Sequence, residues 1–132
     1  MEKNTYKISS DLWSTEEAIA SCAVKASFDV RASLIIVFTH TGITARKIVK
    51  HKPKCPIMAV SNNEWAARSV LIHRGVESMV VGSLVGSEIL TAKVIEFAMK
   101  QRRLIKKGDF VVLTSGQSGS IGSTNLLKII TV

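Results

Sequence analysis

The sequence has 132 residues, enough for one compact domain with a hydrophobic core, and we treat 1–132 as a single domain. Hydrophobic residues make up 46% of the chain, which excludes an intrinsically disordered protein. No apolar run approaches the roughly 20 residues that cross a bilayer, and the first residues lack the basic-then-apolar pattern of a signal peptide. These observations predict a cytoplasmic α/β protein.

The net charge of +8 raises the question of a nucleic-acid partner. The basic residues lie in two stretches, Arg46, Lys47, Lys50, Lys52 and Lys54, and Lys100, Arg102, Arg103, Lys106 and Lys107. No aromatic residues are interleaved with them and no recognised nucleic-acid motif surrounds them. We therefore favour a solvated cationic face near helix C-termini, whose field would also attract a small anionic ligand, and we expect neither nucleic acid nor a membrane as a partner.

The two cysteines, Cys22 and Cys55, are far apart and belong to no Cys-x-x-Cys motif or His cluster. We expect two reduced thiols and no metal site.

The first predicted helix begins at Ser14, because Ser14 and Glu17 form the pattern of a capping box. A continuous apolar run rich in β-branched residues follows at 34–38, and it predicts a strand buried on both faces of a parallel sheet. A turn at 39–44 leads into a second helix that ends near Lys50. The apolar stripe of the first helix has helical spacing and should face the sheet; it consists of Ile19, Cys22, Ala23, Ala26 and Val30.

The middle of the chain repeats this alternation. A buried strand is expected at 57–60. A second capping box, from Ser61 to Glu64, predicts the start of the next helix. Gly75 stands in the position of a helix C-cap and ends that segment.

A third strand is expected at 76–81, followed by a longer helix that Ser87 caps and that ends near Arg103. The inner face of this helix should consist of Leu90, Val94, Phe97 and Ala98.

The last two strands are expected at 110–114 and 127–132. The glycine- and serine-rich segment between them is too short for a crossover helix, so the final strand should return antiparallel as a hairpin. The predicted fold class is α/β: a three-layer α/β/α sandwich of the doubly wound type, with a five-stranded, mostly parallel sheet whose last strand is antiparallel.

The turn after the first strand is the best candidate for a binding site. A helix that starts there directs its first N–H groups, with their partial positive charge, beyond the carboxyl edge of the sheet. Thr39, Thr41 and Thr44 add three hydroxyl donors, and Gly42 lets the backbone approach a ligand. The turn therefore predicts a phosphate pocket, although the same residues are also explained if Thr41 only caps the helix and Gly42 only turns the chain.

A second loop, 116–125, should leave the same edge of the sheet. Open α/β sheets bind ligands at that edge, near the point where the strand order reverses. The loop could close over a ligand at 39–44, or it could be a hairpin tip with no ligand.

Six segments, taken in order and at the same spacing, resemble the C-terminal domain of pyruvate kinase. They span nearly the whole chain: 15–24, 41–46, 53–60, 73–76, 104–109 and 122–125. The resemblance implies a domain that holds a sugar-phosphate effector site and contributes to the subunit contacts of a homotetramer. The family's catalytic (β/α)8 barrel, which transfers phosphate from phosphoenolpyruvate to ADP in glycolysis with magnesium and potassium, is absent from this sequence. The chain alone is therefore expected to be catalytically inactive, to bind no cofactor and to have its own catalytic domain and sister subunits as partners.

The resemblance also assigns candidate site residues. Thr39, His40, Thr41, Gly42 and Thr44 match the family's effector-phosphate loop. The loop that folds over the bound sugar matches Gly116, Gln117, Ser118, Gly119, Ser120, Ile121, Gly122, Ser123, Thr124 and Asn125.

The chain departs from the bisphosphate-activated members of the family at 82–90. It has neither the Trp nor the Arg that those members use there for a second phosphate. We therefore expect a sugar monophosphate or an inorganic anion as effector. A stand-alone phosphometabolite-binding module with the same fold and no kinase barrel is the alternative.

Overall fold

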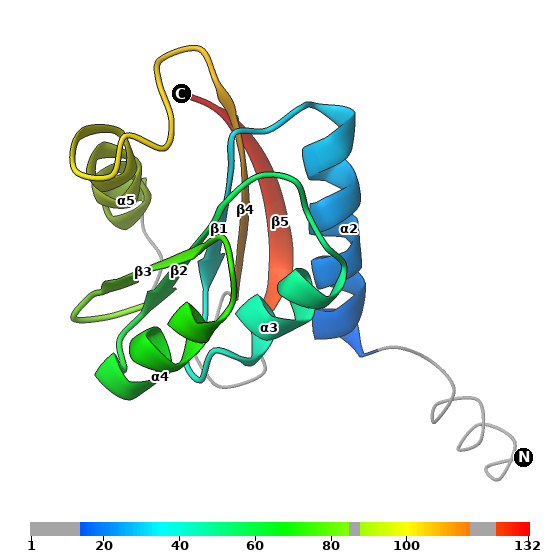
Figure 1. Ribbon diagram of the computed structural model, residues 1–132, viewed down its shortest axis with the longest axis vertical. Coiled ribbons are helices and arrows are strands. Elements are labelled where there is room, and N and C mark those ends of the chain that lie inside the picture. Colours follow the sequence, from blue (N-terminus) through cyan, green and yellow to red (C-terminus); the bar gives the residue numbers. More distant parts are fainter. Residues whose placement is uncertain (1–13, 85–87, 117–123) are drawn as a thin grey trace, which may run out of the picture.

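The computed structural model describes residues 14–84, 88–116 and 124–132, and it contains one five-stranded sheet with the order β3-β2-β1-β4-β5 (Figure 1). The three pairings among β3, β2, β1 and β4 are parallel, and β4 and β5 are antiparallel. The predicted fold class is therefore confirmed, including the antiparallel last strand. The strands are β1 (Leu34–Phe38), β2 (Ile57–Ser61), β3 (Val76–Val80), β4 (Phe110–Gly116) and β5 (Thr124–Thr131).

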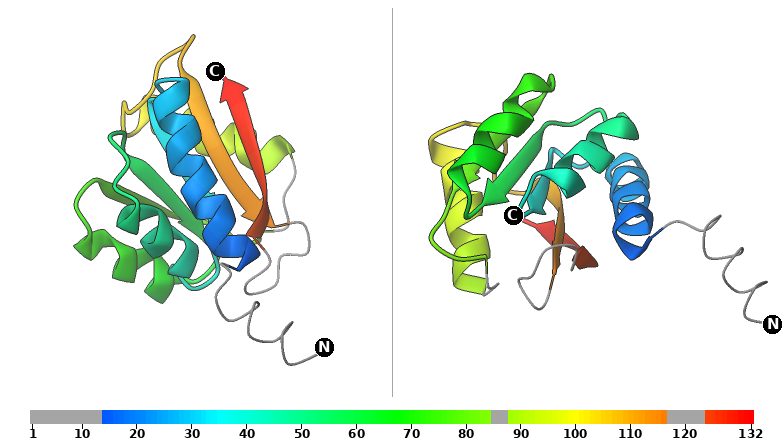
Figure 2. Two further views of the ribbon diagram at one scale, coloured as in Figure 1. Left: turned by 90° about the vertical axis from the view of Figure 1, so that its right-hand side faces the viewer. Right: turned by 90° about the horizontal axis from the view of Figure 1, so that it is seen from below.

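Helices cover both faces of the sheet, but unequally. Figure 2 shows α2 on one side of the sheet and α5 on the other. Buried residues of α2, α3 and η1 share a core cluster with one face of the strands, and those of α5 share a second cluster with the opposite face. The helices are α2 (Thr15–Asp29), α3 (Ile43–Lys50), α4 (Glu64–Ser69), the 3₁₀ helix η1 (Val70–Ile72) and α5 (Glu88–Lys100). Within the described residues, no helix combines the length and the apolar character that crossing a membrane requires.

The central strand β1 is buried along its whole length. Ile35 and Val37 face α2 and α3, whereas Leu34, Ile36 and Phe38 face α5. Strand side chains alternate between the two faces, so a strand covered on both sides must be apolar throughout. This confirms the reading of the 34–38 run.

The first helix begins as predicted, but its buried stripe is different. Ser14 is the N-cap, and its Oγ accepts a hydrogen bond from Glu17 N (3.1 Å). The predicted stripe placed Cys22 against the sheet, which is wrong because Cys22 is exposed. The buried residues are Ala20, Ala23, Val24 and Ser27. Small apolar residues occur all round this helix, so helical spacing alone does not select one face.

The second predicted capping box is also wrong. Ser61 is the last residue of β2 and is fully buried, and Asn63 is the N-cap of α4. Asn63 Oδ1 accepts hydrogen bonds from Trp65 N (2.9 Å) and Ala66 N (3.3 Å). An amide oxygen caps a helix as well as a hydroxyl does, and Asn63 is the cap because β2 continues through Ser61.

Two other boundaries differ from the predictions, and a third is not described. Gly75 has the expected left-handed backbone, with φ +80°, but lies two residues beyond His73, which caps η1. Helix α5 ends at Lys100 and not near Arg103, whose φ of +54° is incompatible with a helix. The predicted cap Ser87 lies outside the described residues.

Candidate functional site

The turn at 39–44 lies where the order of the strands reverses. The chain runs from β1 through β2 to β3 on one side of β1, and β4 lies on the other side. Val37 near the end of β1 pairs with Ala59 of β2 and with Thr114 of β4. The turn therefore occupies the carboxyl-edge position at which doubly wound sheets bind ligands.

Gly42 gives this turn its shape. It is the residue before α3, and its φ of +88° lies in the left-handed region. A Cβ at this position would lie 2.9 Å from Val70 Cγ1, so only glycine fits between the turn and η1.

Two threonine hydroxyls in the turn accept hydrogen bonds from the backbone. Thr39 Oγ1 accepts from Gly42 N (2.9 Å), and Thr41 Oγ1 accepts from Ile43 N at the longer distance of 3.4 Å. The alternative role of Thr41 as a helix cap is thus partly met: its hydroxyl binds the first N–H of α3, although Gly42 is the N-cap residue. A hydroxyl that accepts can still donate its own hydrogen. Thr39 is buried and Thr41 only half-buried, so Thr41 offers the more accessible hydroxyl of the two.

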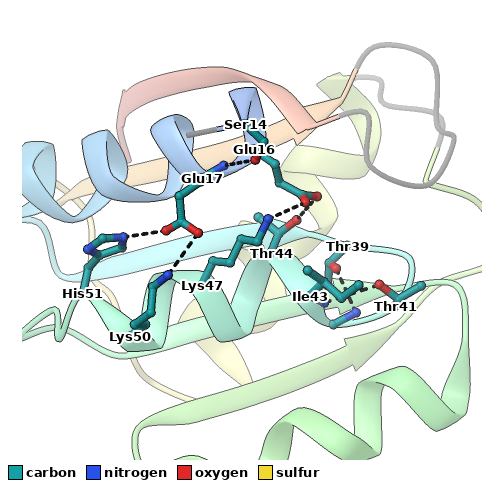
Figure 3. Close-up of polar contacts among 11 residues, drawn as sticks. Ser14, Glu16, Glu17, Thr39, Thr41, Ile43, Thr44, Lys47, Lys50 and His51 are labelled. Carbon is teal, nitrogen blue, oxygen red and sulfur yellow. Dashed lines mark hydrogen bonds and ion pairs between the residues drawn. The ribbon is translucent and has the colours of Figure 1, made fainter. Parts of the chain in front are cut away.

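The third threonine points elsewhere. Thr44 is buried in the first turn of α3, and its Oγ1 donates to Glu16 Oε2 of α2 (2.8 Å). Lys47, one turn further along α3, donates to the other oxygen of the same carboxylate (3.1 Å). Figure 3 shows Thr44 directed toward Glu16, away from the pair formed by Thr39 and Thr41. The three hydroxyls therefore do not converge in this structure.

A second carboxylate on α2 holds the other end of α3. Glu17 accepts from Lys50 Nζ (3.0 Å), and His51 Nε2 lies 2.9 Å from its second oxygen (Figure 3). The hydrogen bond with His51 is the main cause that lowers the pKa of the Glu17 carboxyl, against the opposing effect of burial, and Lys50 acts in the same direction as His51. Neighbouring glutamates thus bind opposite ends of one helix. No local pattern in the chain indicated these partners, because acidic residues in a first helical turn are already explained by the helix dipole.

His40 is the remaining predicted site residue in the turn at 39–44. Its carbonyl oxygen accepts from Ser61 Oγ (3.3 Å), which ties the turn to the end of β2. Its ring Nε2 is enclosed and has no hydrogen-bond partner in the described part of the chain.

The predicted covering loop is only partly described. Residues 117–123 lie outside the described residues, and only the backbone is described for Gly116, Thr124 and Asn125. The backbone of Gly116 pairs with that of Thr124, so the two ends of the loop meet at the end of β4. Because β4 is the neighbour of β1, these ends lie at the same sheet edge as Thr39.

The basic stretches are partly neutralised by ion pairs. Lys47 and Lys50 pair with the two glutamates of α2, Lys100 lies 3.9 Å from Glu96, and Arg102 lies 3.6 Å from Glu77. Other cations line two adjacent cavities of about 390 and 410 Å³ beside the loop that precedes β2: Arg31 and Lys54 in the first, and Lys52, Lys54 and Arg74 in the second. These cavities lie at the amino edge of the sheet, opposite the turn at 39–44.

Both thiols are free, as expected. Cys55 is half-buried, and burial raises the pKa of its thiol. The described residues include no group of three His, Cys, Asp or Glu side chains that could hold a metal ion.

Comparison with known proteins gives one consistent family. Residues 17–130 match the family model described as "Pyruvate kinase, alpha/beta domain". The pyruvate kinase of Dictyostelium discoideum is 42% identical over 120 residues, and that of Eimeria tenella is 36% identical over 119 residues. These matches cover 90% and 89% of this chain, but only 24% and 22% of the relatives.

Solved structures agree. A crystal structure of a pyruvate kinase from Cryptosporidium parvum superposes with a TM-score of 0.81 at 37% identity, over 91% of this chain and 23% of that one. The Cryptosporidium parvum enzyme in complex with ADP gives a TM-score of 0.83 at 38% identity, with similar coverage. The chain thus spans about a quarter of the length of the proteins it matches.

Proposed function

The chain belongs to the pyruvate kinase family, whose alpha/beta domain it forms, and on this premise we propose that it is the effector-binding and assembly domain of a pyruvate kinase. In this proposal the turn at 39–44 binds the phosphate of the effector. The parent enzyme, with its barrel, magnesium and potassium, would carry out the transfer of phosphate from phosphoenolpyruvate to ADP in the cytoplasm. The partners of this domain are then its own catalytic domain and sister subunits.

The observation that carries the proposal is the strand–turn–helix junction between β1 and α3 at the point where the strand order reverses. Helix α3 begins at this edge, and the N–H groups of its first turn carry a partial positive charge that favours an anion. Gly42 keeps side-chain bulk away from the turn. Thr41 supplies a half-buried hydroxyl whose hydrogen is available to a phosphate oxygen.

The ligand class follows from the charges near the turn. A phosphate bound there would meet one helix N-terminus and hydroxyl donors. The segment 82–90, which would have to hold a second phosphate, contains Glu88 and no cation. A sugar monophosphate or an inorganic anion therefore suits the site better than a bisphosphate.

Titration calorimetry of the 132-residue chain tests this proposal with three ligands: inorganic phosphate, glucose 6-phosphate and fructose 1,6-bisphosphate. We expect glucose 6-phosphate to bind at least as tightly as the bisphosphate. Tighter binding of the bisphosphate would contradict the ligand class. If none of the three ligands binds, the proposed site itself is wrong.

A further inference from the structure

Glu16 places a negative charge on the helix that carries the proposed phosphate site. Its two carboxylate oxygens accept from Thr44 Oγ1 (2.8 Å) and from Lys47 Nζ (3.1 Å). Thr44 and Lys47 are three residues apart, so they lie on the same face of α3, beginning in its first turn. A hydroxyl and an ammonium from the first turns of a helix are the groups that an incoming phosphate would use.

We propose that Glu16 is an internal competitor for the anion site: its carboxylate occupies Thr44 Oγ1 and Lys47 Nζ, and it must release them for an effector phosphate to bind at full strength. The inference rests on the proposed function of the turn. It makes Glu16 the residue that sets the affinity of the site.

Burial strengthens the competition. The Glu16 side chain is 14% exposed and that of Lys47 is 26% exposed, so solvent screens this pair less than a surface pair. The carboxylate also lies at the N-terminal end of α3, where it already satisfies part of the helix's preference for negative charge. A phosphate bound in the same region would be repelled by this charge while it remains in place.

Release of Glu16 would not detach α2 from α3. Ala20 and Ala23 of α2 lie in the same buried cluster as Ala45 and Ile48 of α3. At the other end of α3, Glu17 keeps Lys50 and His51. The Glu16 contacts can therefore open while the two helices stay packed, which lets the site respond to a ligand without unfolding.

Glu17 also provides a matched control, because it is the next residue on the same helix and binds α3 away from the turn. Phosphate affinity should be measured by calorimetry for the wild-type chain, Glu16→Gln and Glu17→Gln, with inorganic phosphate and glucose 6-phosphate as probes. Glutamine keeps the size of the side chain and removes its charge. We expect Glu16→Gln to tighten binding about tenfold and Glu17→Gln to change it less than about twofold.

The double variant Glu16→Gln/Thr44→Val tests whether Thr44 is the group for which Glu16 competes. We expect it to lose the part of the gain that the Thr44 hydroxyl supplies and to keep the part that comes from Lys47 and from the removed charge. An unchanged or weaker affinity in Glu16→Gln, an equal gain in Glu17→Gln, or a double variant that binds phosphate as tightly as Glu16→Gln would each overturn the inference. If neither the wild-type chain nor Glu16→Gln binds phosphate, the proposed function fails. Normal wild-type binding with no effect of Glu16→Gln refutes only the role of Glu16.

Discussion

Gly42 lies directly against Val70, so that a Cβ added to Gly42 would come within 2.9 Å of Val70 Cγ1. The contact joins the turn before α3 to the 3₁₀ helix η1, two segments 28 residues apart in the sequence. The shape of the candidate site therefore depends on packing between this turn and η1.

Gly42→Ala is expected to lower the free energy of unfolding by about 2–4 kcal/mol. Alanine is strained in the left-handed backbone conformation, and its Cβ would also clash with Val70. Gly75→Ala is the matched control. Gly75 has a similar φ of +80° but no atom within 4 Å of an added Cβ, so only the backbone cost of about 1–2 kcal/mol applies. Urea denaturation of both variants measures the difference. Equal losses would show that Val70 does not restrict residue 42.

Thr114→Val is expected to leave stability unchanged or raise it by up to about 1 kcal/mol. Thr114 is fully buried in β4, and its Oγ1 has no hydrogen-bond partner in the described part of the chain. Valine removes a buried hydroxyl while keeping the shape of the side chain.

Ser61→Ala is the opposite case. The buried Ser61 hydroxyl accepts from Asn63 N (3.0 Å) and donates to His40 O (3.3 Å). Its removal should cost about 1–3 kcal/mol, because a backbone N–H and a carbonyl lose their partner. Thermal denaturation of both variants checks the pair. A larger loss in Thr114→Val than in Ser61→Ala would contradict this assignment of buried hydroxyls.

The stability of the α2–α3 contact should depend on pH. His51 and Lys50 lower the pKa of Glu17 in the folded protein, so the ionised carboxylate contributes stability above its unfolded pKa of about 4.3, and that contribution is lost as pH falls through the lower folded value. We expect Glu17→Gln to be less stable than the wild-type chain at pH 7 and the two to converge in acid.

Urea titrations between pH 3 and pH 7 measure this convergence. Asp29→Asn provides the control, since Asp29 forms an exposed pair with Lys25 that should contribute little at any pH. A stability difference for Glu17→Gln that does not change with pH would exclude the carboxylate charge as its cause.

Thr41→Val should weaken phosphate binding by about 1–3 kcal/mol, because the accessible hydroxyl of the turn no longer donates to a charged ligand. Thr131→Val serves as the control: Thr131 is exposed at the end of β5 and pairs with Phe110 at the amino edge of the sheet. Calorimetry with inorganic phosphate compares the two. Unchanged affinity in Thr41→Val would mean that the anion binds elsewhere. The cationic cavities at the opposite edge of the sheet would then be the next candidate site.

The two thiols should differ in reactivity. Cys22 is exposed on α2, whereas Cys55 is half-buried and has a pKa raised by burial. A thiol-specific reagent at pH 8 should modify Cys22 rapidly and Cys55 slowly, and Cys22→Ser should remove the fast phase. A fast phase that survives in Cys22→Ser would show that Cys55 is accessible.

The sequence alone determined the architecture, because the relevant signals are local. The five apolar residues of β1 require cover on both faces, and the short segment after β4 allows only an antiparallel return. The turn at 39–44 could be predicted in the same way, because the sequence itself shows small residues between a strand pattern and a helix pattern.

Only the tertiary structure decided which groups meet. The buried side of α2 excludes Cys22, although spacing allowed it, because small residues permit several faces to pack. Asn63 replaces Ser61 as the cap of α4 because β2 runs on to Ser61. Glu16 accepts a hydrogen bond from Thr44, which is 28 residues away in the sequence. This contact exists because α2 packs beside α3, and no local sequence pattern encodes it.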